Sequence, residues 1–235
     1  MNNILTIFKK ELRSFFNSPV AYIVIVVFLI ITGYFFTNTL FVAGVVSMRG
    51  VFEIIPFILL FFIPAISMRS FSEEKKSGTI EMLLTKPISD FDIVLGKFLS
   101  TLTLVALTFV PTIIYVISLK FLGPLDLGSI ISAYIGLVLM SAVYISIGLL
   151  ASSLTENQVI AFIISFLIVF VLFMMNKMLL FIPAPLVSIV EYISSDYHFS
   201  SIARGVLDTK DIIYYFSGVY LMLLLTKTSL ESRKW

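Results

Sequence analysis

The side chains that most often carry out catalysis or bind metals are scarce in this chain of 235 residues, which has one histidine and no cysteine. His198 has two acidic residues near it in sequence, Glu191 and Asp196. These three residues form the one set that could bind a metal weakly or serve as a base beside a nucleophile. Zinc sites of the usual His and Cys type need more such ligands. We therefore expect a polar histidine at a membrane interface, with no metal site and no catalytic residue.

The chain also lacks a phosphate-binding loop. Gly96 and Lys97 form the dipeptide that ends such loops, but Phe98 follows where Ser or Thr is required. The first glycine of the motif is replaced by Phe91. The sequence therefore predicts that this chain does not hydrolyse nucleotides.

Composition indicates a membrane protein. Hydrophobic residues make up 59% of the chain and charged residues 13%, whereas soluble domains have roughly 45–50% and 25%. These values exclude a soluble enzyme, a nucleic-acid-binding protein and a disordered chain. Because a membrane span takes about 20 apolar residues, we predict six spans, at residues 20–36 (or to 40), 52–68, 93–119, 130–150, 159–175 and 212–225.

The predicted fold is all-α, because a lone strand in lipid would leave its backbone groups unpaired. It is a polytopic membrane protein whose residues 1–235 form a single transmembrane domain. No predicted span has an acidic residue at its centre, and Glu53 lies at an edge close to Arg49. Carriers driven by proton or sodium gradients usually have an ionisable group at membrane depth. Energy for active transport would therefore have to come from another subunit.

The distribution of Lys and Arg predicts the orientation. With both termini in the cytoplasm, the outer side holds only five of the 16 basic residues: Arg49, Lys120, Lys177, Arg204 and Lys210. The positive-inside rule favours this arrangement. The other eleven are then on the cytoplasmic side: Lys9, Lys10, Arg13, Arg69, Lys75, Lys76, Lys86, Lys97, Lys227, Arg233 and Lys234.

Three prolines fall inside predicted spans. Pro56 and Pro64 lie in the second span and Pro111 lies in the third. Each removes a backbone donor and can bend its helix. They are candidate helix bends, either as simple curvature or as pivots for gating.

Residues 1–18 predict an amphipathic helix in the inner membrane interface. At 100° per residue, one arc is apolar and the other side is polar. Pro19 then turns the chain into the first span. The apolar arc contains Ile4, Leu5, Phe8, Leu12, Phe15 and Phe16, and the polar side Lys9, Lys10, Arg13 and Asn17.

The cytoplasmic segment 69–92 combines many charges with a short apolar run. Ser77 is a plausible N-cap, Glu81 suits the first turn of a helix, and Pro87 ends it. The expected helix has about two turns and no core of its own. It is either a connector lying on lipid or a docking lever that fits a cytoplasmic partner.

The outer segment 176–211 is too apolar for a loop in water. We expect a helix at 186–193 that dips back into the outer leaflet, and a second helical turn at 200–207 that Asp208 ends. Such outer re-entrant helices either cover a translocation route or form plain interfacial caps.

The sequence resembles a known family. The stretch EEKKSGTIEMLLTKPIS (residues 73–89), followed by Gly96-Lys97, together with the amphipathic N-terminus and six spans, is similar to the permease subunit of type-2 ABC exporters. The segments DYHFSSIARGVLDTKDIIYYFS (196–217) and LTKTSLESRKW (225–235) resemble the gliding-motility and copper-enzyme-maturation branch of that family.

The resemblance implies a multi-pass protein of the bacterial inner membrane. A cytoplasmic ABC ATPase dimer would bind ATP and Mg, so this chain needs no cofactor. Other implied partners are a second permease copy, membrane lipid and an accessory membrane protein with an outer domain. A route between two permeases would be lined mainly by spans two and five. The implied docking residues are Glu73, Glu74, Lys75, Lys76, Ser77, Gly78, Thr79, Ile80, Glu81, Met82, Leu83 and Leu84.

The functional hypothesis is therefore the permease subunit of an ATP-driven exporter. Two alternatives are a membrane scaffold for a motility or secretion apparatus, and a membrane-embedded enzyme acting on lipids. The second alternative would have to rely on the group around His198. Apolar, aromatic-rich spans suit lipids, amphiphilic peptides and drugs equally, so the sequence indicates no cargo.

Overall fold

The computed structural model describes residues 2–79 and 88–232, and within these residues the chain is helical without any strand. Short π or 3₁₀ turns cover Asn38–Val42, Val110–Thr112 and Leu179–Phe181. The α-helices are α1 (Asn2–Asn17), α2 (Pro19–Thr37), α3 (Arg49–Ser67), α4 (Arg69–Lys76), α6 (Asp90–Phe109), α7 (Ile113–Lys120), α8 (Leu127–Leu154), α9 (Gln158–Lys177), α10 (Ala184–Ile193), α11 (Ser195–Ile202) and α12 (Thr209–Glu231).

Among the described residues, six helical stretches are long and apolar enough to cross a membrane, which confirms the prediction of an all-α fold with six spans. The third begins at Asp90 rather than at residue 93, because the Ser89 side chain accepts a hydrogen bond from the N–H of Asp92 and caps the helix. The stretches are Pro19–Val42, Arg49–Lys76, Asp90–Lys120, Leu127–Leu154, Gln158–Lys177 and Thr209–Glu231.

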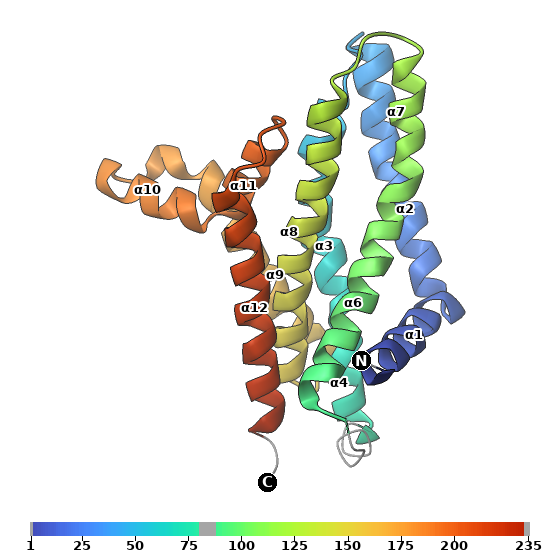
Figure 1. Cartoon of the computed structure of the whole chain (residues 1–235), viewed down its shortest axis with the longest axis vertical. Helices are drawn as coiled ribbons and strands as arrows, with labels where there is room; N and C mark the ends of the chain where they lie inside the picture. The colour runs from blue at the N-terminus through green and yellow to red at the C-terminus, as the bar shows by residue number, and fades with distance from the viewer. Residues whose placement is uncertain (1, 80–87, 233–235) are drawn as a thin grey trace.

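Helix α8 is the centre of the bundle and packs against α3, α6, α9 and α12 (Figure 1). Small residues make this possible, since they let neighbouring helices approach closely. A Cβ atom on Gly136 would lie 3.0 Å from Ile202 Cγ2, and one on Gly148 would lie 1.9 Å from Ser67 Oγ. Two glycines thus fix how closely α11 and α3 approach α8.

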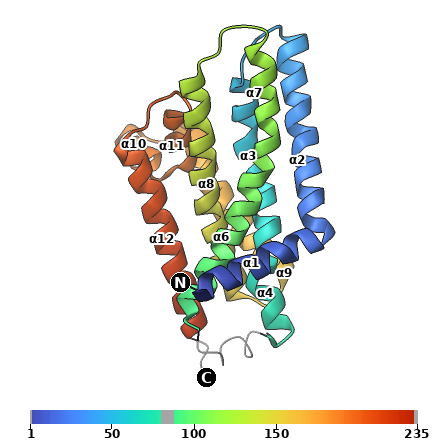
Figure 2. The same ribbon diagram turned by 45° about the vertical axis from the view of Figure 1, so that its right-hand side comes forward.

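Both termini lie at the same end of the bundle, which we call the termini end (Figure 1). The α2–α3 and α7–α8 connections lie at the opposite end, called the far end. Helix α1 runs across the bundle near the termini end (Figure 2). Helix α10 projects sideways from the bundle, nearer the far end (Figure 1).

The amphipathic helix predicted at the N-terminus is present as α1, but part of its apolar surface packs on protein. Ile7, which lies outside the predicted apolar arc, is buried, whereas Leu5 is 51% exposed. The contact is made against Gly96 of α6, where a Cβ atom would lie 2.6 Å from Ile7 Cγ2. Tertiary packing on α6 therefore selects a contact face of α1 that includes Ile7.

The second helical turn predicted in the outer segment is misplaced. Helix α10 contains the predicted 186–193, but α11 spans Ser195–Ile202 instead of 200–207. The chain leaves α11 through Gly205, whose φ of 93° suits glycine alone. Asp208 does not end that helix: it begins α12, because its side chain accepts a hydrogen bond from the N–H of Lys210. This bond lowers the pKa of Asp208.

The three prolines occupy two kinds of position. Pro56 and Pro64 lie inside α3, which ends three residues after Pro64. Pro111 lies in the 3₁₀ turn that separates α6 from α7. Pro64 and Pro111 thus lie at or near irregularities of their spans, whereas Pro56 lies within continuous helix, and the role of the three prolines as pivots stays a prediction.

Replacing Gly148 by Ala tests the close approach of α8 and α3. The new methyl group would overlap Ser67 Oγ, and overpacking of this kind costs about 1–3 kcal/mol. We expect a lower midpoint of thermal unfolding, measured by circular dichroism in detergent, and partial recovery when Ser67→Gly is added. Gly218→Ala is the matched control, because its methyl group would make an ordinary 3.4 Å contact with Val143. Equal midpoints for the two alanine variants would contradict this assignment.

Candidate functional site

The predicted docking segment is attached to a break in the second span. Helix α3 ends at Ser67 and α4 begins at Arg69. Pro64 has no N–H and cannot donate to the carbonyl of Leu60, so α3 lacks one helical hydrogen bond in the turn before the break. The break lies inside the bundle, so the backbone groups that it frees need partners.

The hydroxyl of Ser152 on α8 supplies these partners. Its oxygen accepts hydrogen bonds from the N–H groups of Phe71 and Ser72, at 2.9 and 3.0 Å. The same hydroxyl donates to the carbonyl of Met68 at 2.9 Å. One buried side chain thus uses its full bonding capacity to join α8 to the start of α4.

An ion cluster joins α4 to two more helices. Lys97 Nζ of α6 lies 2.8 Å from Glu74 Oε1 of α4 and 3.2 Å from Glu11 Oε1 of α1. The Lys97 side chain is only 3% exposed, and its Nζ lies 5.2 Å from the centre of the Phe71 ring. Because the lysine is buried, the pair is screened little by solvent and fixes α1, α4 and α6 to one another.

A second lysine of α4 also points into the bundle. Lys75 is buried, and its Nζ donates a hydrogen bond to the carbonyl of Ser153 on α8. The Ser229 hydroxyl of α12 donates to the same carbonyl at 3.3 Å. The C-terminal end of α8 is therefore bonded to both α4 and α12.

The structure divides the predicted docking residues into two groups. Glu74 and Lys75 make contacts inside the bundle, although the sequence resemblance placed them on the docking flank. Glu73 is exposed and pairs with Arg69 at 3.1 Å. The remaining described members, which are exposed and lead into the undescribed stretch, are Lys76, Ser77, Gly78 and Thr79.

The capping role predicted for Ser77 is wrong. Ser77 has helical backbone angles and lies at the C-terminal end of α4, where its hydroxyl donates to the carbonyl of Glu73 at 2.9 Å. Gly78 follows with a φ of 69°, a conformation that often ends helices. The other predicted docking residues lie outside the described residues: Ile80, Glu81, Met82, Leu83 and Leu84.

The second polar cluster, at the far end, has a different partner from the one expected. His198 Nδ1 lies 2.6 Å from Asp211 Oδ1, and both side chains are fully buried. His198 Nε2 donates to the carbonyl of Tyr192 at 3.1 Å. Asp196 instead contacts Lys177 at 2.9 Å. The proposed set of His198 with Glu191 and Asp196 is therefore not assembled.

Both ring nitrogens of His198 are occupied, which leaves no lone pair facing a substrate or metal. Among the described residues, no group of three His, Asp or Glu side chains could hold a metal ion. The ring stacks on Tyr214, with 4.0 Å between the ring centres. This geometry fits a structural link between α11 and α12.

Sequence reasoning missed the most important contacts at the termini end. In the sequence, Ser152 is one of several small residues near the fourth span, and Glu11 is an acidic residue among the basic residues of the N-terminal helix. Neither residue therefore stood out as a partner of a distant segment. The available signal was the position of Lys97, which follows a glycine near the start of the third predicted span. A lysine at that depth needs an acidic partner.

Removing the charge of Lys97 tests the cluster. Lys97→Met would leave Glu74 without its cation and Glu11 with only the exposed Lys10 at 3.8 Å, and breaking a buried pair in this way costs about 3 kcal/mol or more. We expect a clear fall in the unfolding midpoint in detergent. The control is Glu73→Gln, which removes an exposed pair worth less than about 1 kcal/mol. A Lys97→Met variant as stable as Glu73→Gln would show that the cluster does not stabilise the fold.

Comparison with known proteins identifies the family of this chain. Residues 5–226 match a family model described as ABC-2 family transporter protein. No curated protein matches the chain. Membrane components of this family pair with separate ABC ATPase subunits and typically lack catalytic activity of their own. Since the match covers nearly all of the sequence, the chain belongs to the ABC-2 transporter family, as a membrane permease component.

Proposed function

We propose that this chain is the permease subunit of an ATP-driven exporter whose ATPase docks at the exposed end of α4. The observation that carries the proposal is the contrast between the buried contacts of α4 and the exposure of the residues at its C-terminal end. Phe71, Ser72, Glu74 and Lys75 are bonded to α6 and α8. The described residues that follow them, Lys76, Ser77, Gly78 and Thr79, are exposed. A force applied at the exposed end would thus reach several spans.

The proposed path of that force follows the described contacts. Displacement of α4 acts on α3 through the Met68 break and on α6 through Glu74 and Lys97. The same displacement acts on α8 through Ser152 and Ser153. Because α8 contacts most of the other spans, movement of its end can be passed to the whole bundle.

In this proposal the termini end faces the cytoplasm, as the positive-inside rule predicts. Cargo would pass beside a second permease copy at a surface formed by α3 and α9. Phe57 and Phe61 of α3 are 43% and 44% exposed, and Phe61 packs on Phe166 of α9 with ring centres 4.9 Å apart. Exposed aromatic rows can pack against a copy of themselves or against apolar cargo. The gliding-motility branch, the homodimer and an accessory membrane protein stay predictions.

Substitution of Gly78 tests the docking surface. Gly78→Val would place a bulky side chain on the exposed turn and disturb its left-handed backbone. We expect about a tenfold weaker association with the ABC ATPase, equivalent to ~1.4 kcal/mol, measured by co-purification from membranes. Gly44→Val is a close control, since Gly44 has a φ of 68° and open space around it but lies in the α2–α3 connection at the far end. Equal ATPase binding by both variants would contradict docking at this turn.

Substitution of Ser152 tests transmission separately from docking. Ser152→Ala removes the hydroxyl that bonds the N–H groups of Phe71 and Ser72, at a cost of about 1–3 kcal/mol, whereas the Met68 carbonyl still accepts a hydrogen bond from the Ser72 hydroxyl. We expect the ATPase to bind normally while the permease-dependent change in its hydrolysis rate falls.

The matched control is Ser146→Ala on the same helix, because the Ser146 hydroxyl bonds only to the carbonyl of Val143 in its own helix. If Ser152→Ala bound the ATPase and altered hydrolysis to the same extent as Ser146→Ala, the Ser152 contact would have no part in transmission.

A further inference from the structure

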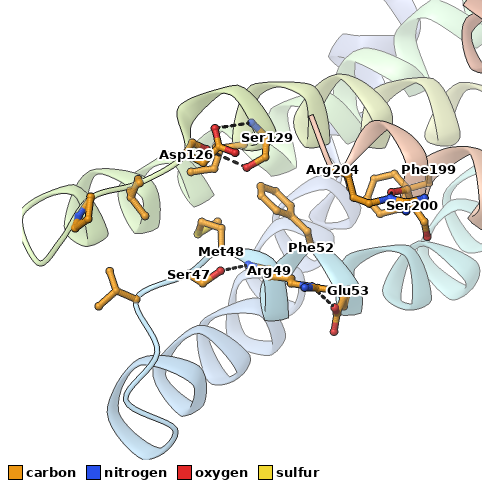
Figure 3. Close-up of a pocket in the computed structure, with 15 residues that line it drawn as sticks. Ser47, Met48, Arg49, Phe52, Glu53, Asp126, Ser129, Phe199, Ser200 and Arg204 are labelled. Atoms are coloured by element: carbon orange, nitrogen blue, oxygen red, sulfur yellow. Dashed lines mark hydrogen bonds and ion pairs between the residues drawn. The ribbon is translucent and has the colours of Figure 1, made fainter. Parts of the chain in front are cut away.

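A pocket of about 490 Å³ lies at the far end, where α3 and α8 begin and α11 ends. This volume is within the range of small-molecule sites. Its buried floor is apolar, and polar and charged residues surround it (Figure 3). The floor residues, each less than 9% exposed, are Met48, Phe52, Ile130 and Phe199.

Two arginines and two carboxylates line the pocket, so its formal charges balance in number, but Arg204 differs from the other three in its partners. Arg49 pairs with Glu53 at 3.0 Å. The carboxylate of Asp126 accepts hydrogen bonds from two N–H groups of the first turn of α8, at 3.0 and 3.3 Å, and so caps that helix. Within the described residues, no carboxylate lies within 4.0 Å of Arg204. Its Nε donates only to a backbone carbonyl, that of Ser200.

The beginning of α3 adds to this positive character. At the start of α3, the neutral Ser47 hydroxyl accepts a hydrogen bond from the N–H of Arg49 at 3.1 Å, and, in contrast to α8, no carboxylate caps the helix. The positive end of the α3 dipole therefore meets no negative charge in its first turn. With the Arg204 guanidinium, it favours an anion, and guanidinium groups bind phosphate with paired N–H donors.

The depth of the pocket identifies the source of the anion. Two candidate spans begin at the pocket wall, at Arg49 and Leu127, so the pocket lies where apolar span meets headgroup. A soluble anion would make no favourable contact with the apolar floor, whereas a phospholipid has both a phosphate and an apolar part. We propose that this pocket binds the headgroup of an anionic phospholipid, with the phosphate at Arg204 and the adjoining apolar part over Phe52 and Phe199. This site is independent of the ATPase-docking proposal.

The test uses the full chain purified in detergent, without an ATPase. Native mass spectrometry would follow binding of phosphatidylglycerol and of phosphatidylcholine with the same acyl chains. We expect one phosphatidylglycerol to bind preferentially and Arg204→Gln to weaken this binding about tenfold, as expected for loss of one charge-assisted contact. Arg204→Lys keeps the charge and should retain most of the preference. Since Arg204 is exposed, these variants should keep the unfolding midpoint of the parent chain.

The control is Lys120→Gln, which removes an exposed positive charge at the end of α7, outside the pocket. Equal weakening by Arg204→Gln and Lys120→Gln would mean general surface attraction and would overturn the proposal. Equal binding of the two lipids would overturn it as well. Displacement of the lipid by inorganic phosphate at the same concentration would show a site for a free anion and refute the lipid assignment.

Discussion

The termini end of this protein depends on how one broken helix satisfies its backbone. Buried N–H and C=O groups must be bonded, and inside a membrane water cannot do this. The interruption between α3 and α4 frees such groups, and the hydroxyl of Ser152 binds two of the donors and one acceptor. Because these hydrogen bonds come from α8, the backbone at the break is satisfied only while α8 packs against α4. A span broken in this way can change direction without losing contact with the core.

The same logic explains why charged residues lie in the interior here. Lys97 and Lys75 would be costly inside the bundle if they were alone. Each is held by acceptors from a different helix: Lys97 by Glu11 and Glu74, and Lys75 by the carbonyl of Ser153. These contacts connect α1, α6 and α8 through one short helix. The basic residues before Ser77 therefore differ in role, since Lys75 is part of the internal joint and Lys76 is exposed.

The sequence permits prediction of those features that depend on local pattern. Six spans follow from hydropathy, and α1 follows from periodicity. What could not be predicted depends on contacts between distant residues. Ser152 and Met68 are 84 residues apart, and Lys97 and Glu11 are 86 apart. The register of α11 was missed for the same reason, because the partner of His198 is Asp211 on the next helix, while the sequence drew attention to nearer acidic residues.

The two ends of the bundle are built for different tasks. At the far end, His198 and Asp211 are fully buried, and Tyr192 and Tyr214 complete their surroundings, so that α11 is fixed to α12. At the termini end, the lysine contacts hold a helix that ends at Lys76 and is followed by the exposed Ser77, Gly78 and Thr79, of which Gly78 has a positive φ. In the mechanism that we propose, work done on α4 passes to α6 through Glu74 and to α8 through Lys75, whereas the His198–Asp211 contact holds α11 against α12. The two clusters would thus act on different helices, because no described bond of the His198 cluster reaches α4.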